Sequence, residues 1–221
     1  VGDTDNDTGR CLIADIDPNS PGCEMWWAGS NAHSIGGNDL GYKPSSCNMA
    51  IWFDGTLSRQ LINENTIQSQ AYGRTFTMYR YDESFNNGTK SNPGWYGDIL
   101  GDWREEVIVA DRTKLNDLKV FSTWYPTDHK FPWLMTDHVY AMSALNQNIG
   151  YNQPTHTGYY LGSDLKSDSE AWVATGIASG VVPMPATAVR DAYYNLNGQR
   201  LSAPPAKGVY IKNGKKYVSS R

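Results

Sequence analysis

Short apolar runs separated by polar turns dominate the hydrophobic pattern of this chain. Residues 48–53 form a brief apolar run, while residues 75–81 and 118–124 alternate between two faces as half-buried strands do. Residues 140–145 are a further candidate strand. No segment keeps a helical period of 3.6 residues beyond about three turns, the length of an average helix. The pattern therefore predicts an all-β fold with long loops.

One tight hairpin is expected near the middle of this pattern. Asp54-Gly55 follows the apolar run 48–53, and the segment TLSRQLI at residues 56–62 returns after it. An Asp-Gly pair between two apolar runs is a strong signal for a two-residue hairpin turn.

Two acidic segments resemble one another. Residues 13–27 (IADIDPNSPGCEMWW) and residues 97–110 (GDILGDWREEVIVA) both pass from Asp-Ile through a turn to a glutamate that opens an apolar strand. Internal repeats of tens of residues are typical of propellers, solenoids and arrays. The first aspartates of the two copies, Asp15 and Asp98, are 83 positions apart. This spacing favours a propeller blade with a long loop.

The composition of the chain changes after Gly162. Residues 179–188 are small and contain two prolines, as linkers often do. Two turn signals, Asn197-Gly198 and Asn213-Gly214, follow beside short apolar runs. The predicted organisation is a partial propeller domain over residues 1–165, a linker over 166–190 and a small β-hairpin module over 191–221.

Composition narrows the range of functions. The net charge of -4, without a basic stripe, argues against nucleic-acid binding. The 14 Tyr and 8 Trp suit a surface that stacks on sugars, although they can equally fill an all-β core. No apolar run approaches the ~18 residues of a membrane span. No signal peptide is recognisable and the first residue is not Met, so we expect the sequence to begin within a longer protein.

The cysteines point to neither a disulfide framework nor a zinc site. There are three of them, so at least one is unpaired within the chain. A Cys11–Cys23 bridge is possible but nothing in the sequence demands it. The chain has no CxxC pair, which makes zinc binding an unlikely function.

The first acidic turn is a candidate calcium loop. Asp15, Asp17 and Asn19 place side-chain oxygens at alternate positions, and Glu24 arrives nine residues after the first aspartate. Calcium takes six to eight oxygen ligands, some of them backbone carbonyls, so such a loop suits it. The alternative is an ordinary surface turn rich in Asp and Asn.

The second copy strengthens the calcium hypothesis. Asp98, Asp102 and Glu106 repeat the acidic positions, but Leu100 replaces the second aspartate and can offer only its carbonyl oxygen. Asn148 is a further candidate ligand. Calcium is thus the predicted cofactor.

Three other features could meet a substrate. Asn87-Gly88-Thr89-Lys90 is a turn that carries a cation, suited to sugar hydroxyls and a uronate carboxylate or, alternatively, only an exposed turn. Asn152 offers an amide in a loop stiffened by Pro154, where His156 could equally serve only to hold the loop. Arg10 is a lone cation ahead of the first acidic turn; by itself it would most often be a salt-bridge partner.

Several motifs together resemble a known family. The stretches NNGTKSNP, GDILGDWREEVI, YPTDHK and NIGYNQPTHTGYYLG, in this order and spacing, resemble the rhamnogalacturonan lyases of polysaccharide lyase family 11. DTGRCLIADIDPNSPGCEMW and NMAIWFDGTLSRQLI resemble the preceding part of the same domain, so the likeness covers roughly residues 5–165. The tail resembles C-terminal tails on secreted and surface proteins of Bacteroidetes-type bacteria.

The resemblance implies an eight-bladed β-propeller with bound calcium and a central cleft, which cleaves the rhamnose–galacturonate linkage by β-elimination. It implies that this chain is the C-terminal portion, that a second chain could carry the missing blades, and that the protein is secreted, periplasmic or on the cell surface. Lys90 becomes the candidate catalytic base. The implied substrate contacts are Arg10, Asn87, Gly88, Thr89 and Asn152. The implied calcium ligands are Asp15, Asp17, Glu24, Asp98, Leu100, Asp102 and Glu106.

Two other functions remain open from the sequence. A non-catalytic, calcium-dependent propeller that binds carbohydrate would use the same acidic loops. An adhesion module built on such loops would need no sugar at all.

Overall fold

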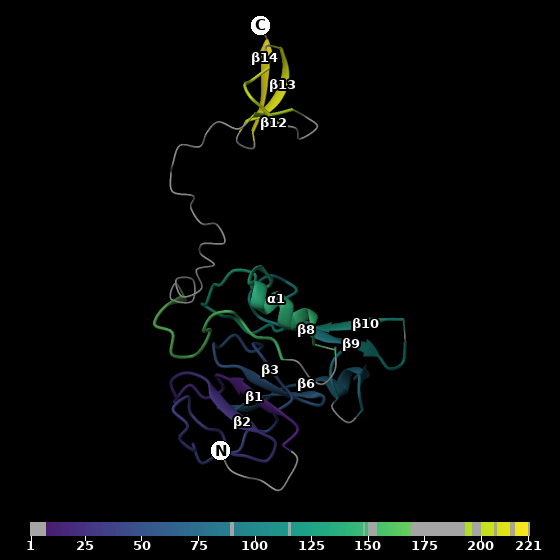
Figure 1. Ribbon diagram of the computed structural model, residues 1–221. Helices are drawn as coiled ribbons and strands as arrows, with labels where there is room; N and C mark the ends of the chain where they lie inside the picture. Colours follow the sequence, from purple (N-terminus) through teal and green to yellow (C-terminus); the bar gives the residue numbers. More distant parts are fainter. Residues whose placement is uncertain are drawn as a thin grey trace. The chain divides into compact units, whose positions relative to one another are not determined.

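The structure, a computed structural model, is mostly β-sheet with few helices (Figure 1). Its described strands form four antiparallel sheets, of which one has two strands and three have four. The prediction of an all-β chain with long loops is confirmed at this level. The described residues are 8–88, 91–114, 116–147, 149, 154–168, 193–195, 200–205, 207–212 and 215–220.

The strands are short and the loops between them are long. The strands are β1 (Cys11–Ala14), β2 (Glu24–Trp27), β3 (Met49–Ile51), β4 (Gln60–Asn63), β5 (Thr66–Ser69), β6 (Gly73–Thr77), β7 (Glu83–Ser84), β8 (Trp95–Gly97), β9 (Glu106–Asp111), β10 (Leu118–Phe121), β11 (Tyr193–Tyr194), β12 (Arg200–Leu201), β13 (Lys207–Lys212) and β14 (Lys215–Ser220). The helices are η1 (Met78–Tyr81), η2 (Leu134–Thr136) and α1 (His138–Leu145).

The chain divides into two compact units, Val1–Ile177 and Ala178–Arg221. In the second unit β11 to β14 form one sheet in the order β12-β11-β13-β14. Most of the predicted linker over 166–190 lies outside the described residues. No helix among the described residues is long and apolar enough to cross a membrane.

Three hairpins of the first unit share one construction. In β1–β2, β3–β4 and β8–β9 a loop leaves the first strand and returns to a Glu or Gln that pairs with the last residue of that strand. The three closing pairs are Ala14↔Glu24, Ile51↔Gln60 and Gly97↔Glu106. The two acidic segments are therefore equivalent hairpins. The middle copy escaped the sequence comparison because it has Gln60 in place of Glu and Trp52 in place of Asp.

The segment 140–145, expected as a strand, is instead part of helix α1. The Asp137 carboxylate caps the helix by accepting a hydrogen bond of 3.1 Å from the Val139 N–H. Tyr140 and Ala144, four residues apart on one face, are fully buried. Its Ala, Met and Leu residues also favour a helix.

The prediction of a two-residue turn at Asp54-Gly55 is also wrong. These residues lie in the eight-residue loop 52–59, where the Gln60 side chain accepts hydrogen bonds from the backbone of Phe53 and Asp54. The two-residue turn lies instead at Glu64-Asn65, between β4 and β5, and Glu64 has a positive φ of 54°.

Two expected strands end earlier than the alternation suggests. Over residues 75–81 the chain leaves β6 after Thr77 and continues as η1. Over residues 118–124 strand β10 ends at Phe121. Cys11, Cys23 and Cys47 are all free thiols, so the optional Cys11–Cys23 bridge is absent.

The three hairpins converge on a buried interior. Side chains from β3 to β6 and from β8 and β9 make one apolar cluster, and a second cluster joins Trp52 and Trp103 to α1. Figure 1 shows α1 beside β8, and β1 near the β3–β6 sheet. The packing brings the loops of the three hairpins to one region.

Candidate functional site

One side chain closes the loop of each of the three hairpins. An oxygen of Glu24, Gln60 or Glu106 accepts hydrogen bonds from two consecutive backbone N–H groups at the start of its own loop. The distances are 2.9 and 3.2 Å for Glu24, 2.7 and 2.9 Å for Gln60, and 2.9 and 3.1 Å for Glu106. The donors are Ile16 and Asp17, Phe53 and Asp54, and Ile99 and Leu100.

Successive hairpins are joined in the same way. The Arg59 N–H donates a hydrogen bond of 2.6 Å to the carbonyl oxygen of Asp15. The Glu105 N–H donates one of 2.7 Å to the carbonyl oxygen of Trp52. In each case the residue before the closing Gln or Glu bonds to the first loop residue of the preceding hairpin. The loop ends of the three hairpins therefore lie side by side.

A buried ion pair lies where these ends meet. The Arg59 and Glu105 side chains are 3.5 Å apart and only 4% and 0% exposed. The Arg59 guanidinium also lies 4.2 Å from the centre of the Trp52 ring. One Glu105 oxygen accepts hydrogen bonds from Tyr140 Oη at 2.7 Å and Thr155 Oγ1 at 2.6 Å. This cluster holds both hairpin loops, α1 and the segment after residue 153 together.

The second acidic loop satisfies its own carboxylates. Asp98 accepts four backbone hydrogen bonds, from Gly101, Asp102, Trp103 and Leu134. Asp102 is paired with the Arg104 guanidinium. The Leu100 side chain is exposed, and its backbone N–H donates a hydrogen bond to Glu106.

Burial disfavours the charged forms of the carboxyl groups in the second loop. It raises the pKa of Asp98 and raises the pKa of Glu106 to about 7, although backbone N–H donors lower both values in part. A cation near Glu106 would relieve this cost. The Asp98 oxygens, each already bonded to two N–H groups, offer such a cation a poor site.

The first acidic loop fits a cation better. Asp15 accepts hydrogen bonds from the Tyr160 hydroxyl and from Ser163. The second oxygen of Glu24, Oε1, is buried and makes no hydrogen bond of normal geometry among the described residues, although the nearby Ser20 side chain partly lowers the pKa of Glu24. Burial raises the pKa of Glu24 and of Asp15. Among the residues that the structure describes, no three His, Cys, Asp or Glu side chains converge as a metal site, so further ligands would have to come from backbone oxygens.

Two of the candidate substrate residues precede the strands that the acidic loops follow. Arg10 lies before β1 and Asn87 before β8, and Asn48 has the equivalent place before β3. A cavity of about 260 Å³ is lined by residues of the first two hairpins at this end of their strands. Among its lining residues are Arg10, Trp26, Trp27, Lys43, Asn48 and Asn63. Arg10 Nη1 is buried there without a hydrogen-bond partner among the described residues.

The turn at Asn87 is the exposed end of a short hairpin. Asn87 and Gly88 are exposed, Asn87 has a φ of 52°, and its carbonyl accepts a hydrogen bond of 2.8 Å from the Ser91 N–H. Asn86 and Asn92 pair beneath it as a bridge. Thr89 and Lys90 lie outside the described residues, so the roles predicted for them stay predictions.

The loop that carries Asn148 and Asn152 is anchored to the same strand as that turn. Both residues lie outside the described part of the chain, but Gln147 hydrogen-bonds to the backbone N–H and carbonyl of Tyr96 in β8. After the loop, the Thr155 N–H donates to the Tyr96 hydroxyl at 3.0 Å. The residues that flank this loop are thus fixed to β8, the strand that follows the Asn87 turn in the chain.

Sequence reasoning missed the residues that hold this arrangement. Arg59 and Glu105 stand at equivalent places, each directly before the closing Gln60 or Glu106. The equivalence of these two positions can be recognised only once the middle hairpin is known to be a third copy. His156, considered as a loop holder, lies beside this cluster; its side chain is partly exposed, and partial desolvation together with the Arg59 charge lowers its pKa to about 4.

Residues 2–171 match the family described as rhamnogalacturonan lyase family 11, C-terminal domain. The chain belongs to this family. Relatives in the family include the rhamnogalacturonan endolyase YesW of Bacillus subtilis, 41% identical over 163 residues, and the exolyase YesX of the same organism, 37% identical over 180 residues. Each alignment covers 72% of this chain but only 26% of YesW and 29% of YesX.

Solved structures of this lyase family have the same fold. The crystal structure of YesW aligns with a TM-score of 0.68 at 39% identity, over 73% of this chain and 28% of that one. A Bacillus licheniformis rhamnogalacturonan lyase aligns with a TM-score of 0.68 at 41% identity over the same shares. This family-11 chain therefore spans less than a third of the relatives that it matches.

Proposed function

We propose that this chain is the C-terminal portion of a rhamnogalacturonan lyase that cleaves the rhamnose–galacturonate linkage of the pectin backbone by β-elimination. The three equivalent hairpins are consecutive blades of an eight-bladed propeller, and the remaining blades come from upstream sequence or from a second chain. The family membership and the regular joining of the hairpins support this architecture.

The observation that carries the proposal is the cavity around Arg10. A buried arginine nitrogen without a hydrogen-bond partner among the described residues invites an anionic group, because an unpaired buried charge is costly. Lys43 adds a second positive charge, and the half-buried Trp27 adds flat apolar surface. A galacturonate ring, with one carboxylate and two broad faces, suits this set of groups.

The reaction removes the proton α to the uronate carboxylate and then expels the sugar linked at O4. That proton is weakly acidic while the carboxylate is negative, so neutralisation by Arg10 favours the charge that develops. A neutral Lys90 amine is the proposed base, and neighbouring positive charge would lower its pKa. Asn87, Gly88, Thr89 and Asn152 are the proposed contacts to sugar hydroxyls.

Calcium is proposed as the resident cation. Asp17, Glu24 and loop carbonyl oxygens would hold it in the first acidic loop, where Glu24 Oε1 makes no hydrogen bond of normal geometry to the described part of the chain. Bound there, the ion supplies positive charge that offsets the buried carboxylates and fixes the loop. The second loop, with Asp98, Leu100, Asp102 and Glu106, is a weaker candidate because Asp98 is already satisfied by N–H donors. Asn148 stays a proposed ligand.

The test begins with this chain as it stands. Rhamnogalacturonan I oligosaccharides should bind it with lower affinity after Arg10→Ala, whereas the exposed control Arg112→Ala should bind as the wild type does. Formation of the unsaturated product, followed by ultraviolet absorbance, is then measured in the full-length protein with and without Lys90→Ala. Near-normal turnover of that variant would exclude Lys90 as the base. Binding without any product would favour a carbohydrate-binding propeller instead.

We also propose that the protein is exported, with residues 191–221 as a tail module at the cell surface, in the periplasm or in the medium. The polymeric substrate and the resemblance of the tail support this location. Fractionation of cells that express the full-length protein tests it; recovery only from the cytoplasm would contradict it.

A further inference from the structure

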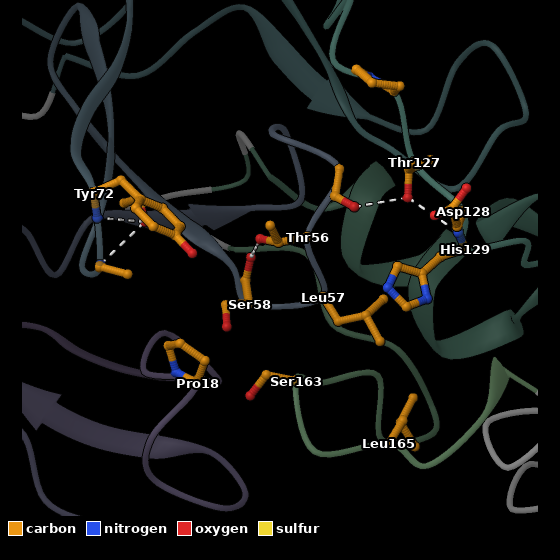
Figure 2. Close-up of a pocket in the computed structure, with 14 residues that line it drawn as sticks. Pro18, Thr56, Leu57, Ser58, Tyr72, Thr127, Asp128, His129, Ser163 and Leu165 are labelled. Carbon is orange, nitrogen blue, oxygen red and sulfur yellow. Dashed lines mark hydrogen bonds between the residues drawn. The ribbon is translucent and has the colours of Figure 1, made fainter.

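A second cavity, of about 360 Å³, lies among the loop ends of the first unit (Figure 2). Pro18 comes from the first acidic loop, and Gly55 to Ser58 come from the loop between β3 and β4. These loops follow β1 and β3, whereas Arg10 and Asn48 precede the same strands. The cavity is therefore at the other end of these hairpins from the Arg10 cavity and lies outside the proposed active site.

Two rings and several hydroxyl groups line this space. Figure 2 shows Tyr72 on one side and His129 on the other, with Thr56, Leu57 and Ser58 between them. Tyr72 is 78% exposed, so burial in the core does not explain this large aromatic side chain. A partly exposed ring beside hydroxyl groups offers a flat face and hydrogen-bonding partners together.

The charges of the two cavities differ. No Lys or Arg is among the described residues that line the second cavity; its titratable members are Tyr72, Asp128 and His129, of which only Asp128 carries a full charge at neutral pH. His129 Nδ1 is already 2.9 Å from Asp168 Oδ1. Asp128 would repel a carboxylate. A ligand here is thus expected to be uncharged, unlike a ligand beside Arg10 and Lys43.

The walls of the cavity are held in place before any ligand binds. Thr127 Oγ1 donates a hydrogen bond of 2.8 Å to the Gly55 carbonyl oxygen, and Asp54 Oδ1 accepts one of 2.6 Å from Thr56 Oγ1. Gly55 has a φ of 86°, and a Cβ there would lie 3.3 Å from the Pro126 carbonyl oxygen. Glycine therefore permits the close approach of residues 126–127. A preformed site loses less conformational freedom on binding.

We infer that the cavity between Tyr72 and His129 binds a neutral mono- or disaccharide, separately from the proposed lyase cleft. Its volume is at the low end of the roughly 300–1,000 Å³ that small-molecule sites occupy. The sugar ring stacks on Tyr72, and its hydroxyl groups meet Ser58. They also donate to the oxygens of Thr56 and Ser163, whose own protons are bonded to Asp54 and Asp15. Such a site would hold neutral carbohydrate near the enzyme without presenting a uronate for elimination.

The experiment measures binding of defined sugars to the 221-residue chain by isothermal titration and saturation-transfer NMR. Lactose, cellobiose and maltose are the neutral probes, and digalacturonate is the acidic one. At least one neutral probe is expected to bind, and Tyr72→Ala should weaken it about tenfold, which corresponds to about 1.4 kcal/mol. Tyr79→Ala, a change at another exposed tyrosine on η1, should leave the affinity within about twofold of the wild type.

Two further variants make the outcome decisive. Ala71→Trp, at an exposed lining position, should fill the cavity and abolish binding while the melting temperature is kept. Arg10→Ala should leave neutral-sugar binding unchanged, which separates this site from the proposed active site. The inference is overturned if no neutral probe binds, if Tyr72→Ala binds as well as the wild type, or if digalacturonate alone binds through Tyr72.

Discussion

The Arg59 guanidinium lies 3.5 Å from the Glu105 carboxylate, and both side chains are almost completely buried. The two residues occupy the same place in consecutive hairpins, directly before Gln60 and Glu106. The ion pair thus joins two repeats at equivalent positions. Through Thr155 it also holds the segment that follows the predicted substrate residue Asn152.

Removing one partner of this pair should destabilise the fold strongly. Glu105→Gln leaves the Arg59 charge buried without a counter-charge, and such changes cost roughly 3–5 kcal/mol of unfolding free energy. The double variant Arg59→Met/Glu105→Gln should lose less than the sum of the single variants, because no unpaired charge remains. Urea denaturation of the four proteins measures the difference.

The exposed pair of Arg112 and Asp82 is the matched control. Its side chains are 67% and 54% exposed at a distance of 3.0 Å, so Asp82→Asn should cost less than about 1 kcal/mol. Equal losses for Glu105→Gln and Asp82→Asn would show that the buried pair has no special role.

The equivalence of Gln60 and Glu106 predicts the effect of Glu106→Gln. Gln60 makes the same two backbone bonds without a charge, so Gln should close the second loop as well. Burial raises the pKa of Glu106 from 4.5 to about 7, so the folded protein binds this proton more tightly than the unfolded chain. The stability of the metal-free wild type should therefore fall as pH rises from about 4.5 to 7, by about 3 kcal/mol at most.

Glu106→Gln should remove this fall, so that the variant is the more stable protein at pH 8 and the two converge near pH 4.5. Thermal melting in chelator across this range measures the difference. A variant less stable than the wild type at pH 8 in chelator would mean that the charge itself is needed.

Calcium should act through the first loop rather than the second. If Glu24 Oε1 contacts the ion, calcium raises the melting temperature of the wild type, and chelator reverses the increase. Glu24→Gln should lose most of that increase, whereas Glu106→Gln should keep it. The reverse order of the two variants would place the ion in the second loop, and no response of the wild type would remove calcium from the proposal.

His156 should titrate far below a free histidine. Partial desolvation of this otherwise exposed side chain and the Arg59 charge lower its pKa from 6.5 to about 4, so the folded state favours the neutral ring. The stability that this ring contributes is present above about pH 6.5 and is lost as pH falls toward 4. The NMR signal of its ring protons should have a midpoint near pH 4.

His156→Gln should flatten this acid-side loss relative to the wild type. The comparison must be a difference between the two proteins, because the buried carboxylates act in the opposite direction over the same range. A midpoint of His156 near 6.5 would show that the ring is well solvated.

Local patterns in the sequence were sufficient to predict some of the strands and the repeated acidic hairpin. The alternation of residues 118–121 predicted a strand because side chains on a pleated strand alternate between faces. The continuous apolar run before Asp54 predicted a strand that is buried on both faces. The likeness of the Asp15 and Asp98 segments predicted one construction for both. The helix at 138–145 was missed because its eight residues span only two turns, too short for a clear period.

The sequence by itself determined the family, the β-rich class and the paired acidic hairpins, because each follows from residues close together in the chain. Only the tertiary structure revealed the third hairpin, the Arg59–Glu105 pair and the two cavities. These depend on contacts between residues such as Arg59 and Thr155, which are distant in sequence. Packing also decided which carboxylates are already satisfied: Asp98 finds N–H donors in its own loop and at Leu134, whereas one buried oxygen of Glu24 has no partner of normal hydrogen-bond geometry in the residues that the structure describes.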